Sequence, residues 1–304
     1  MDIAGLFIGK GAIVQVKSSD AAPMTLRDND AGTLYDGPLV IMVNNGSASA
    51  SEIMAAALQD YGRALIVGTN TFGKGTVQKV IGLEEVLDPI TRMKLGASKE
   101  PPLGALKITM QKFYRVDGGS TQRKGVTPDV VIPDAYELLE NLGESRDKAA
   151  LPWDRIAALP IERSNKALPI AMLAQRSKAR IASNGAFQII QSSAQKLKAR
   201  ENGHYYPLSE VAYRTDLKEG NALSKQLEEL EKAGHPLKIY NLKADEPKIN
   251  LDTTTVAKNK AFLKLLQKDI YLSEAVNIMN DLAGKGGVGV TGTKEPRSVK
   301  EMVR

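Results

Sequence analysis

Two short apolar runs, separated by one amphipathic stretch, form the clearest pattern in the chain. Residues 38–43 and 64–67 are continuous apolar runs, which are typical of strands buried on both faces. Between them, a turn-forming Asn-Asn-Gly sequence precedes residues 49–61, which carry apolar positions at helical spacing, and Gly62 suits the position just past a helix end. The pattern therefore predicts a strand–helix–strand unit of an α/β fold.

The rest of the chain divides into a mixed part and a helical part. The mixed part is expected to contain a helix end at 3–7, a strand at 12–17, polar turns up to residue 36, an irregular surface excursion over 81–105, and strands at 106–116 and 130–132. Helical spacing recurs over 165–183, 185–201, 208–232 and 257–283.

These patterns predict three parts of the chain. A mixed α/β domain covers 1–135 and a mainly helical domain covers 136–283, beginning with a connector that packs through Trp153. Residues 284–304 are Gly-rich and basic, which favours a disordered tail.

Composition narrows the class of protein without deciding its function. A chain of 304 residues has room for two domains, and 42% hydrophobic with 25% charged residues fits a globular protein. No apolar run is long enough to span a membrane. The net charge of +6 comes without a nucleic-acid-binding motif, so we expect no nucleic-acid partner. The absence of cysteine leaves the compartment open, and no metal site or cofactor is indicated.

Histidine usage restricts the catalytic chemistry. The two histidines, His204 and His235, lie far along the chain from the strand–helix–strand unit. A Ser-His-Asp triad within the first domain is therefore excluded. If a serine in that domain is a nucleophile, its base must be another group, and lysine is the obvious candidate.

Ser49 is the first candidate nucleophile. It begins a Ser-Ala-Ser-Glu sequence with Glu52 three residues later, and the more frequent meaning of this pattern is a capping box. A hydroxyl at a helix N-terminus also lies where the helix dipole stabilises developing negative charge, and the N–H of Ala50 would be an oxyanion donor there. Ser47 and Ser51 offer the same hydroxyl, so the residues alone favour Ser49 only weakly.

Lys74 is the candidate base, in a loop after the second apolar run. The commonest role of such a lysine is a solvated surface charge. A phosphate-binding loop is nearly matched from Gly68 to Lys74, but Gly75 replaces the required hydroxyl residue and no clear helix follows. A general base needs a neutral amine, which burial beside apolar groups favours. Gln78 would hold that amine by a hydrogen bond, or it is an ordinary amide on a strand surface.

Longer motifs carry a resemblance to a known family. The sequences GSASASEIMAAALQDYGRALIVG, TFGKGTVQ and KITMQKFYRVDGGSTQRKGVTPDVVIP resemble the carboxy-terminal-processing serine peptidases, specifically those of the tail-specific type from the Gram-negative periplasm. The resemblance continues through ALPWDRI, ARIASNGAFQII and LSEAVNIMNDLA and covers nearly the whole chain except its basic tail. It implies the C-terminal part of a crotonase/ClpP-like protease core over 1–135, followed by a mainly α-helical domain.

The resemblance also implies a Ser–Lys dyad with a supporting glutamine. The family's serine precedes its lysine by 25 positions, as Ser49 precedes Lys74 here. Gln78 falls on the family's glutamine, and the N–H of Ala50 falls on one oxyanion donor. The implied activity is periplasmic endoproteolysis of proteins with apolar, unstructured C-termini, which leaves room for a protein adaptor.

The chain departs from the family at its start. Family members carry a secretory signal, a helical region, a PDZ domain and the first part of the protease core before this point, including a Gly-rich segment that supplies the second oxyanion N–H. The first residues here resemble the middle of a fold rather than a signal peptide, so we expect a fragment or a truncated reading frame. Losing one oxyanion donor typically costs about 10²–10³ in rate. We therefore expect a weakly active or inactive chain, with a non-catalytic binding module as the alternative.

Overall fold

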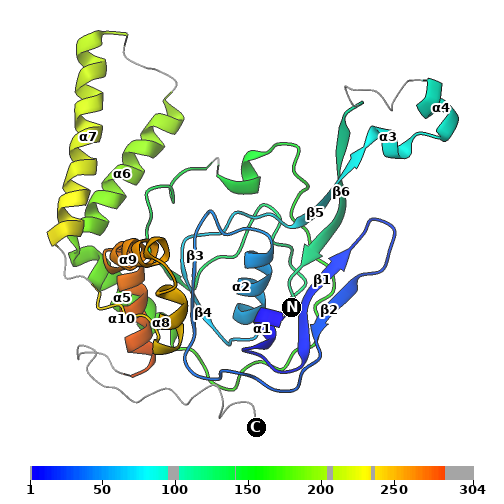
Figure 1. Ribbon diagram of the computed structural model, residues 1–304, viewed down its shortest axis with the longest axis horizontal. Helices are drawn as coiled ribbons and strands as arrows, with labels where there is room; N and C mark the ends of the chain where they lie inside the picture. Colours follow the sequence, from blue (N-terminus) through cyan, green and yellow to red (C-terminus); the bar gives the residue numbers. More distant parts are fainter. Residues whose placement is uncertain (1, 95–102, 141, 204–207, 234–236, 285–304) are drawn as a thin grey trace.

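The computed structural model describes residues 2–94, 103–140, 142–203, 208–233 and 237–284, which form two sheets and a group of helices (Figure 1). The strands are β1 (Gly11–Lys17), β2 (Met24–Asp28), β3 (Val40–Val43), β4 (Leu65–Gly68), β5 (Thr76–Gly82), β6 (Ala105–Tyr114) and β7 (Val130–Val131). The helices of the first half are α1 (Asp2–Gly5), α2 (Ala50–Asp60), α3 (Leu83–Val86) and α4 (Pro89–Lys94). The second half contains η1 (Gly143–Arg146), α5 (Ile170–Ser183), α6 (Gly185–Asn202), α7 (Glu210–Ala233), η2 (Lys243–Asp245), α8 (Glu246–Ile249), α9 (Thr253–Gln267) and α10 (Ile270–Leu282).

The smaller sheet is parallel and places the candidate site. Its order is β3-β4-β7, and Val43 pairs with Gly68 at the carboxyl ends of β3 and β4. A Cβ on Gly68 would lie 1.9 Å from the Val43 carbonyl oxygen, so only glycine allows the strands to approach this closely. Because β3 and β4 run in the same direction, the segments that follow them, 44–49 and 69–75, leave the sheet at the same edge.

Helix α2 fills the space between the two sheets (Figure 1). Its buried alanines share one core with Val43 and Ile66 of the parallel sheet and with Ile13 of β1. The other face of the parallel sheet packs on the C-terminal helices, where Val67 shares a core with Leu173 and Ile278. Strand β4 is therefore covered on both faces, as its apolar sequence predicts. The same prediction for residues 38–43 is wrong in part: β3 is the edge strand of this sheet, is only partly buried, and exposes Met42 at 42%.

The larger sheet is antiparallel, with the order β2-β1-β6-β5. Strands β5 and β6 extend from the body as an arm that carries α3 and α4 near its tip (Figure 1). Their register shifts between Val77 and Gln78. Apolar side chains on the arm are exposed, such as Val80 at 63% and Leu106 at 54%.

An ion-pair network joins α5 to α10 in the helical part. The guanidinium of Arg180 contacts Glu274 at 2.8 Å and Asp281 at 2.7 Å, and Arg176 contacts Asp281 at 2.9 Å. Both carboxylates are almost fully buried. The antiparallel helices α6 and α7 project from this pair (Figure 1).

The predicted fold class is confirmed: a mixed α/β part is followed by a helical part. The strand–helix–strand unit appears within one or two residues of its predicted bounds, and Gly62 adopts φ +63° just after α2. Trp153 packs as expected, because its indole N–H donates to the Ser120 carbonyl at 2.7 Å and Lys124 lies over its ring.

Three predictions of local structure are wrong. The polar segment before residue 36 contains β2, a half-exposed strand that forms because β1 supplies a partner. The excursion at 81–105 is not wholly irregular, since α3 and α4 lie within it. The single helix at 257–283 is two helices, because the Asp269 carboxylate accepts the N–H groups of Tyr271 and Leu272 and starts α10.

Some predictions fall outside the part of the chain that the structure describes. Of the expected tail at 284–304, the structure describes only the first residue. Both histidines, His204 and His235, also lie outside the described residues. The domain boundaries at 135/136 and 283/284 stay predictions.

Candidate active site

Ser49 occupies a strained turn between β3 and α2. Its backbone has φ 57° and ψ −112°, and Arg123 is the other non-glycine residue with positive φ in the described ranges. Such a conformation costs about 1–3 kcal/mol and persists only where the surroundings hold it. The Ser49 side chain is half-buried. A serine on a sharp strand-to-helix turn is also the arrangement that presents a nucleophile in unrelated hydrolases.

Lys74 lies in the loop that follows β4, and its side chain is half-buried. The flanking glycines allow this loop to pack tightly on the neighbouring backbone. A Cβ on Gly73 would lie 2.9 Å from the Arg123 carbonyl carbon, and one on Gly75 would lie 2.5 Å from the Gln122 nitrogen. The loop continues into β5 rather than a helix, so it lacks the context of a phosphate-binding loop.

Glu52 connects the serine turn to the lysine loop. Its side chain is 0% exposed. Its Oε2 accepts the backbone N–H of Ser49 at 2.8 Å and that of Lys74 at 2.9 Å. Its Oε1 accepts the N–H of Gly73 at 2.7 Å and the hydroxyl of Thr71 at 2.5 Å. One buried carboxylate therefore fixes both segments that carry the candidate catalytic residues.

The surroundings of Glu52 act on its protonation in opposite directions. Burial raises the pKa of Glu52 above its ordinary value, while hydrogen bonds from Thr71 and from three backbone N–H groups lower it by less. The Thr71 hydroxyl donates to Glu52, and its oxygen also accepts the N–H of Val126 at 2.7 Å. All four neighbours are donors, so this arrangement suits an ionised carboxylate.

The two loops also bond to each other directly. The N–H of Phe72 donates to the Ser47 carbonyl at 2.9 Å. The Ser47 hydroxyl accepts the Asn44 N–H at 3.1 Å, so it has a structural task within the turn. Ser51 lies exposed in the first turn of α2.

The remaining predicted site residues lie on the two elements that follow the serine turn and the lysine loop. Ala50 is the first residue of α2, where a backbone N–H has no partner within the helix. Gln78 is an exposed residue of β5, at the register shift with β6. Such irregularities commonly redirect a side chain beside a functional site. Ser49, Ala50 and Lys74 thus meet at one sheet edge, and Gln78 lies on the strand that leads away from it.

Two buried polar residues were missed by sequence reasoning. Glu52 was interpreted only as a capping partner, and Gln122, which is also 0% exposed, was not singled out. A signal for Glu52 was present: it lies three and four residues before Ala55 and Ala56 on the buried face of α2. An acidic residue on an apolar helix face requires partners. Nothing comparable marked Gln122.

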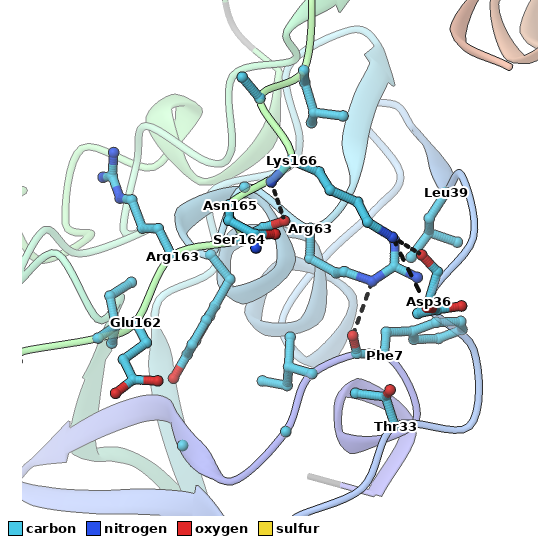
Figure 2. Close-up of a pocket in the computed structure, with 18 of the residues that line it drawn as sticks. Phe7, Thr33, Asp36, Leu39, Arg63, Glu162, Arg163, Ser164, Asn165 and Lys166 are labelled. Atoms are coloured by element: carbon cyan, nitrogen blue, oxygen red, sulfur yellow. Dashed lines mark hydrogen bonds and ion pairs between the residues drawn. The ribbon is translucent and has the colours of Figure 1, made fainter. Parts of the chain in front are cut away.

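Cavities adjoin the site and also occur elsewhere. One of about 320 Å³ lies at the carboxyl ends of β3 and β4 and is lined by residues that include Ser47, Met42 and Tyr271. Another, of about 860 Å³, lies away from Ser49, around Arg63 (Figure 2). Arg63 there donates to the carbonyls of Phe7 and Tyr35, at 2.9 and 2.7 Å, so its guanidinium has a structural role.

Within the described ranges, no group of three or more metal-binding side chains is present. Over the same part of the chain, every helix is too short or too polar to cross a bilayer.

Comparisons with known proteins give matches over both parts of the chain. Residues 1–132 match the family model described as peptidase family S41, and residues 139–284 match the one described as the C-terminal domain of tail specific protease. A tail-specific protease of Haemophilus influenzae is 47% identical over 154 residues, which are 51% of this chain and 21% of that protein. A carboxy-terminal-processing protease of Bartonella bacilliformis is 38% identical over 151 residues, 48% of this chain and 31% of that protein.

A solved photosystem II D1 C-terminal processing protease is 29% identical, with a TM-score of 0.34, over 43% of this chain and 30% of that one. The chain spans 21% and 31% of the length of the two relatives above. The two family matches follow one another along the chain: its first part matches peptidase family S41, and its second part matches the C-terminal domain of tail-specific proteases.

Proposed function

We propose that this chain carries the catalytic dyad of a periplasmic serine endopeptidase that cleaves proteins with apolar, unstructured C-termini. Ser49 is the nucleophile and Lys74 is the general base. Gln78 supports the lysine amine, and the N–H of Ala50 donates to the oxyanion. The substrates are proteins or peptides, with an adaptor protein as a further partner.

The first half-reaction forms an acyl-enzyme. The neutral amine of Lys74 takes the hydroxyl proton of Ser49 as Oγ bonds to the substrate carbonyl carbon. The carbonyl electron pair moves to oxygen, which accepts the N–H of Ala50 at the positive end of α2. The C–N bond then breaks, and the Lys74 ammonium gives its proton to the leaving amine.

The second half-reaction releases the acyl group. Water attacks the ester carbon while Lys74, neutral again, takes a proton from it. The oxyanion collapses, the bond to Ser49 Oγ breaks, and Lys74 returns the proton to that oxygen. The dyad is thereby restored with no net change in charge.

The observation that carries this proposal is the strained conformation of Ser49, held beside the lysine loop by Glu52. Backbone strain at a polar residue needs support from its surroundings, and Glu52 provides that support to Ser49 and Lys74 together. A simple helix cap requires neither a positive φ nor a bond to the Lys74 loop.

A chain completed with the upstream part of a tail-specific relative tests the proposal. Its substrate is an unstructured protein with an apolar C-terminus, compared with the same protein ending in charged residues. Ser49→Ala and Lys74→Ala should each abolish cleavage, while Ser47→Ala should keep it. Full cleavage by Ser49→Ala, or equal cleavage of both substrates, would contradict the proposal.

A non-catalytic binding role is the second candidate. Large apolar side chains are exposed on the arm, such as Val86 at 65% and Met93 at 78%, which favours contact with another protein. This role predicts partner binding that Ser49→Ala leaves unchanged and that charged substitutions on the arm abolish.

A further inference from the structure

The lysine loop is held on its other side by three residues, Gln122, Gly143 and Glu144, which we call the loop clamp. Gln122 uses both ends of its buried amide. Its Oε1 accepts the N–H of Gly75 at 2.8 Å, and its Nε2 donates to Glu144 Oε1 at 3.2 Å. The residue directly after Lys74 is therefore bonded to a side chain that Glu144 holds in place.

A second contact of the loop clamp reaches the residue two positions before Lys74. The N–H of Glu144 donates to the Phe72 carbonyl at 2.9 Å. Gly143 has φ +68°, and a Cβ there would lie 2.2 Å from the same carbonyl oxygen. On its other side Phe72 donates its N–H to Ser47, so it stands between the serine turn and the loop clamp.

The loop clamp joins two parts of the chain. Gln122 and Phe72 lie in the segment that matches peptidase family S41, whereas Gly143 and Glu144 lie in the segment that matches the C-terminal domain of tail specific protease. The first turn of the second segment, η1, therefore contacts the loop that carries the candidate base.

We propose that Gln122 is a positioning residue for Lys74, and that the start of the C-terminal domain, through Gly143 and Glu144, completes the active site by holding the lysine loop. This inference rests on the proposed role of Lys74 as the base. It adds a function for the C-terminal domain within the catalytic site itself.

The Gln122 amide accepts a hydrogen bond through its oxygen and donates one through its nitrogen. A residue that only filled space would need neither. An apolar residue of similar volume would fill the space but leave the Gly75 N–H unpaired in a buried place. The loop would keep its contacts to Glu52 and Ser47 on the side of the serine turn but lose the side-chain acceptor of the Gly75 N–H. Lys74 would sample positions away from Ser49, and proton transfer needs hydrogen-bond reach.

A swap of donor and acceptor tests the contact itself. Gln122→Glu keeps an acceptor for the Gly75 N–H but places a second carboxylate against that of Glu144. Glu144→Gln alone replaces the carboxylate that accepts the Gln122 N–H by an uncharged amide. In the double variant Gln122→Glu/Glu144→Gln, residue 122 accepts from both neighbours and residue 144 donates. The double variant should therefore restore the hydrogen bond between residues 122 and 144 that Gln122→Glu alone loses.

The first readout is amide hydrogen exchange of residues 72–76 in the purified chain, which needs no catalytic activity. Gln122→Glu should accelerate this exchange about tenfold, and the double variant should return it towards the parent rate. Exchange in α10 should stay at the parent rate, since the effect is local.

The second readout is the rate of labelling of Ser49 by a fluorophosphonate in the chain fused to the upstream part of a tail-specific relative. In Gln122→Glu the labelling rate should fall, and the double variant should restore it. A residue that merely supported the fold would lower the labelled amount without changing the rate of the folded fraction. If the fused parent shows no labelling at Ser49, the proposed function fails, while exchange still decides the loop clamp.

Glycine substitutions give an independent test that leaves Gln122 in place. Gly143→Ala should accelerate exchange at 72–76, because its Cβ meets the Phe72 carbonyl. Gly104→Ala is the matched control, since Gly104 also has positive φ, at +100°, but has no atom within 4 Å of an added Cβ. The proposal is overturned if Gln122→Glu and Gly143→Ala both exchange like the parent at 72–76, or if the double variant is no better than Gln122→Glu.

Discussion

The backbone N–H groups of Ser49 and Lys74 donate to the same atom, Oε2 of Glu52, at 2.8 and 2.9 Å. The two residues are 25 positions apart in the sequence and follow neighbouring parallel strands. A buried carboxylate at this junction sets the distance between the two backbones. The relative position of the candidate nucleophile and base is therefore a property of the core rather than of two independent loops.

Glu52→Gln should disrupt this junction while keeping its volume. The amide nitrogen of the variant cannot accept a hydrogen bond. It would therefore lie against N–H donors that a carboxylate oxygen accepts in the parent. We expect a loss of about 1.5–3 kcal/mol in the free energy of unfolding, the range for hydrogen bonds to a charged group. Urea unfolding measures this, with the exposed Glu162→Gln as a control that should change stability by less than about 0.5 kcal/mol. Equal stabilities of the two variants would refute the role given to Glu52.

The strands and the helix that carry Ser49 and Lys74 could be predicted from the sequence, because burial gives them a recognisable apolar pattern. The strands at 38–43 and 64–67 and the helix at 49–61 were recognisable because their apolar residues lie inside a core. The edge at which Ser49 and Lys74 meet followed from the parallel direction of those strands. The choice of Ser49 over its neighbours came from the family resemblance and not from the pattern.

The features that the sequence did not predict depend on contacts between residues far apart in the chain. Strand β2 and helices α3 and α4 are short and largely exposed, so their sequences show little periodicity. The partners of Glu52 on the lysine loop lie about twenty residues further along, and a capping pattern contains no information about them. Gln122 bonds to groups 47 and 22 residues away, which only the folded chain reveals.

Gly68→Ala should weaken the pairing of β3 with β4. Gly68 has φ +125°, and an added Cβ would lie 1.9 Å from the Val43 carbonyl oxygen. The loss of stability should exceed the roughly 1–3 kcal/mol that an unfavourable φ alone costs. Thermal unfolding measures it, and Gly62→Ala is the control, because Gly62 has φ +63° with open space around it. A smaller loss for Gly68→Ala than for Gly62→Ala would show that the strands do not approach this closely.

The link between α5 and α10 should weaken in acid. Burial tends to raise the pKa of Asp281, but hydrogen bonds and charge from Arg180 and Arg176 outweigh it and hold the pKa below the ordinary value of 3.8. A carboxyl with a lowered pKa in the folded state contributes stability above its unfolded pKa. That contribution is lost as the pH falls from about 3.8 through the folded value.

Asp281→Asn isolates this contribution. At neutral pH the variant should be less stable than the parent by about 1–3 kcal/mol, since Arg180 and Arg176 lose a charged partner. The difference should shrink as the pH falls below 3.8, because the parent carboxyl is then protonated as well. Unfolding in urea at several pH values measures the difference. A difference that is constant across this window would contradict the lowered pKa.

The most direct test of the central claim, that Ser49 and Lys74 act as a dyad, is site-mapped labelling with a fluorophosphonate of the chain fused to the upstream part of a tail-specific relative. The reagent bonds only to an activated serine, and mass spectrometry identifies the modified residue. We predict modification of Ser49, its loss in Lys74→Ala, and its retention in Ser47→Ala. Modification of another serine, or labelling of Ser49 in Lys74→Ala at the parent rate, would contradict the account.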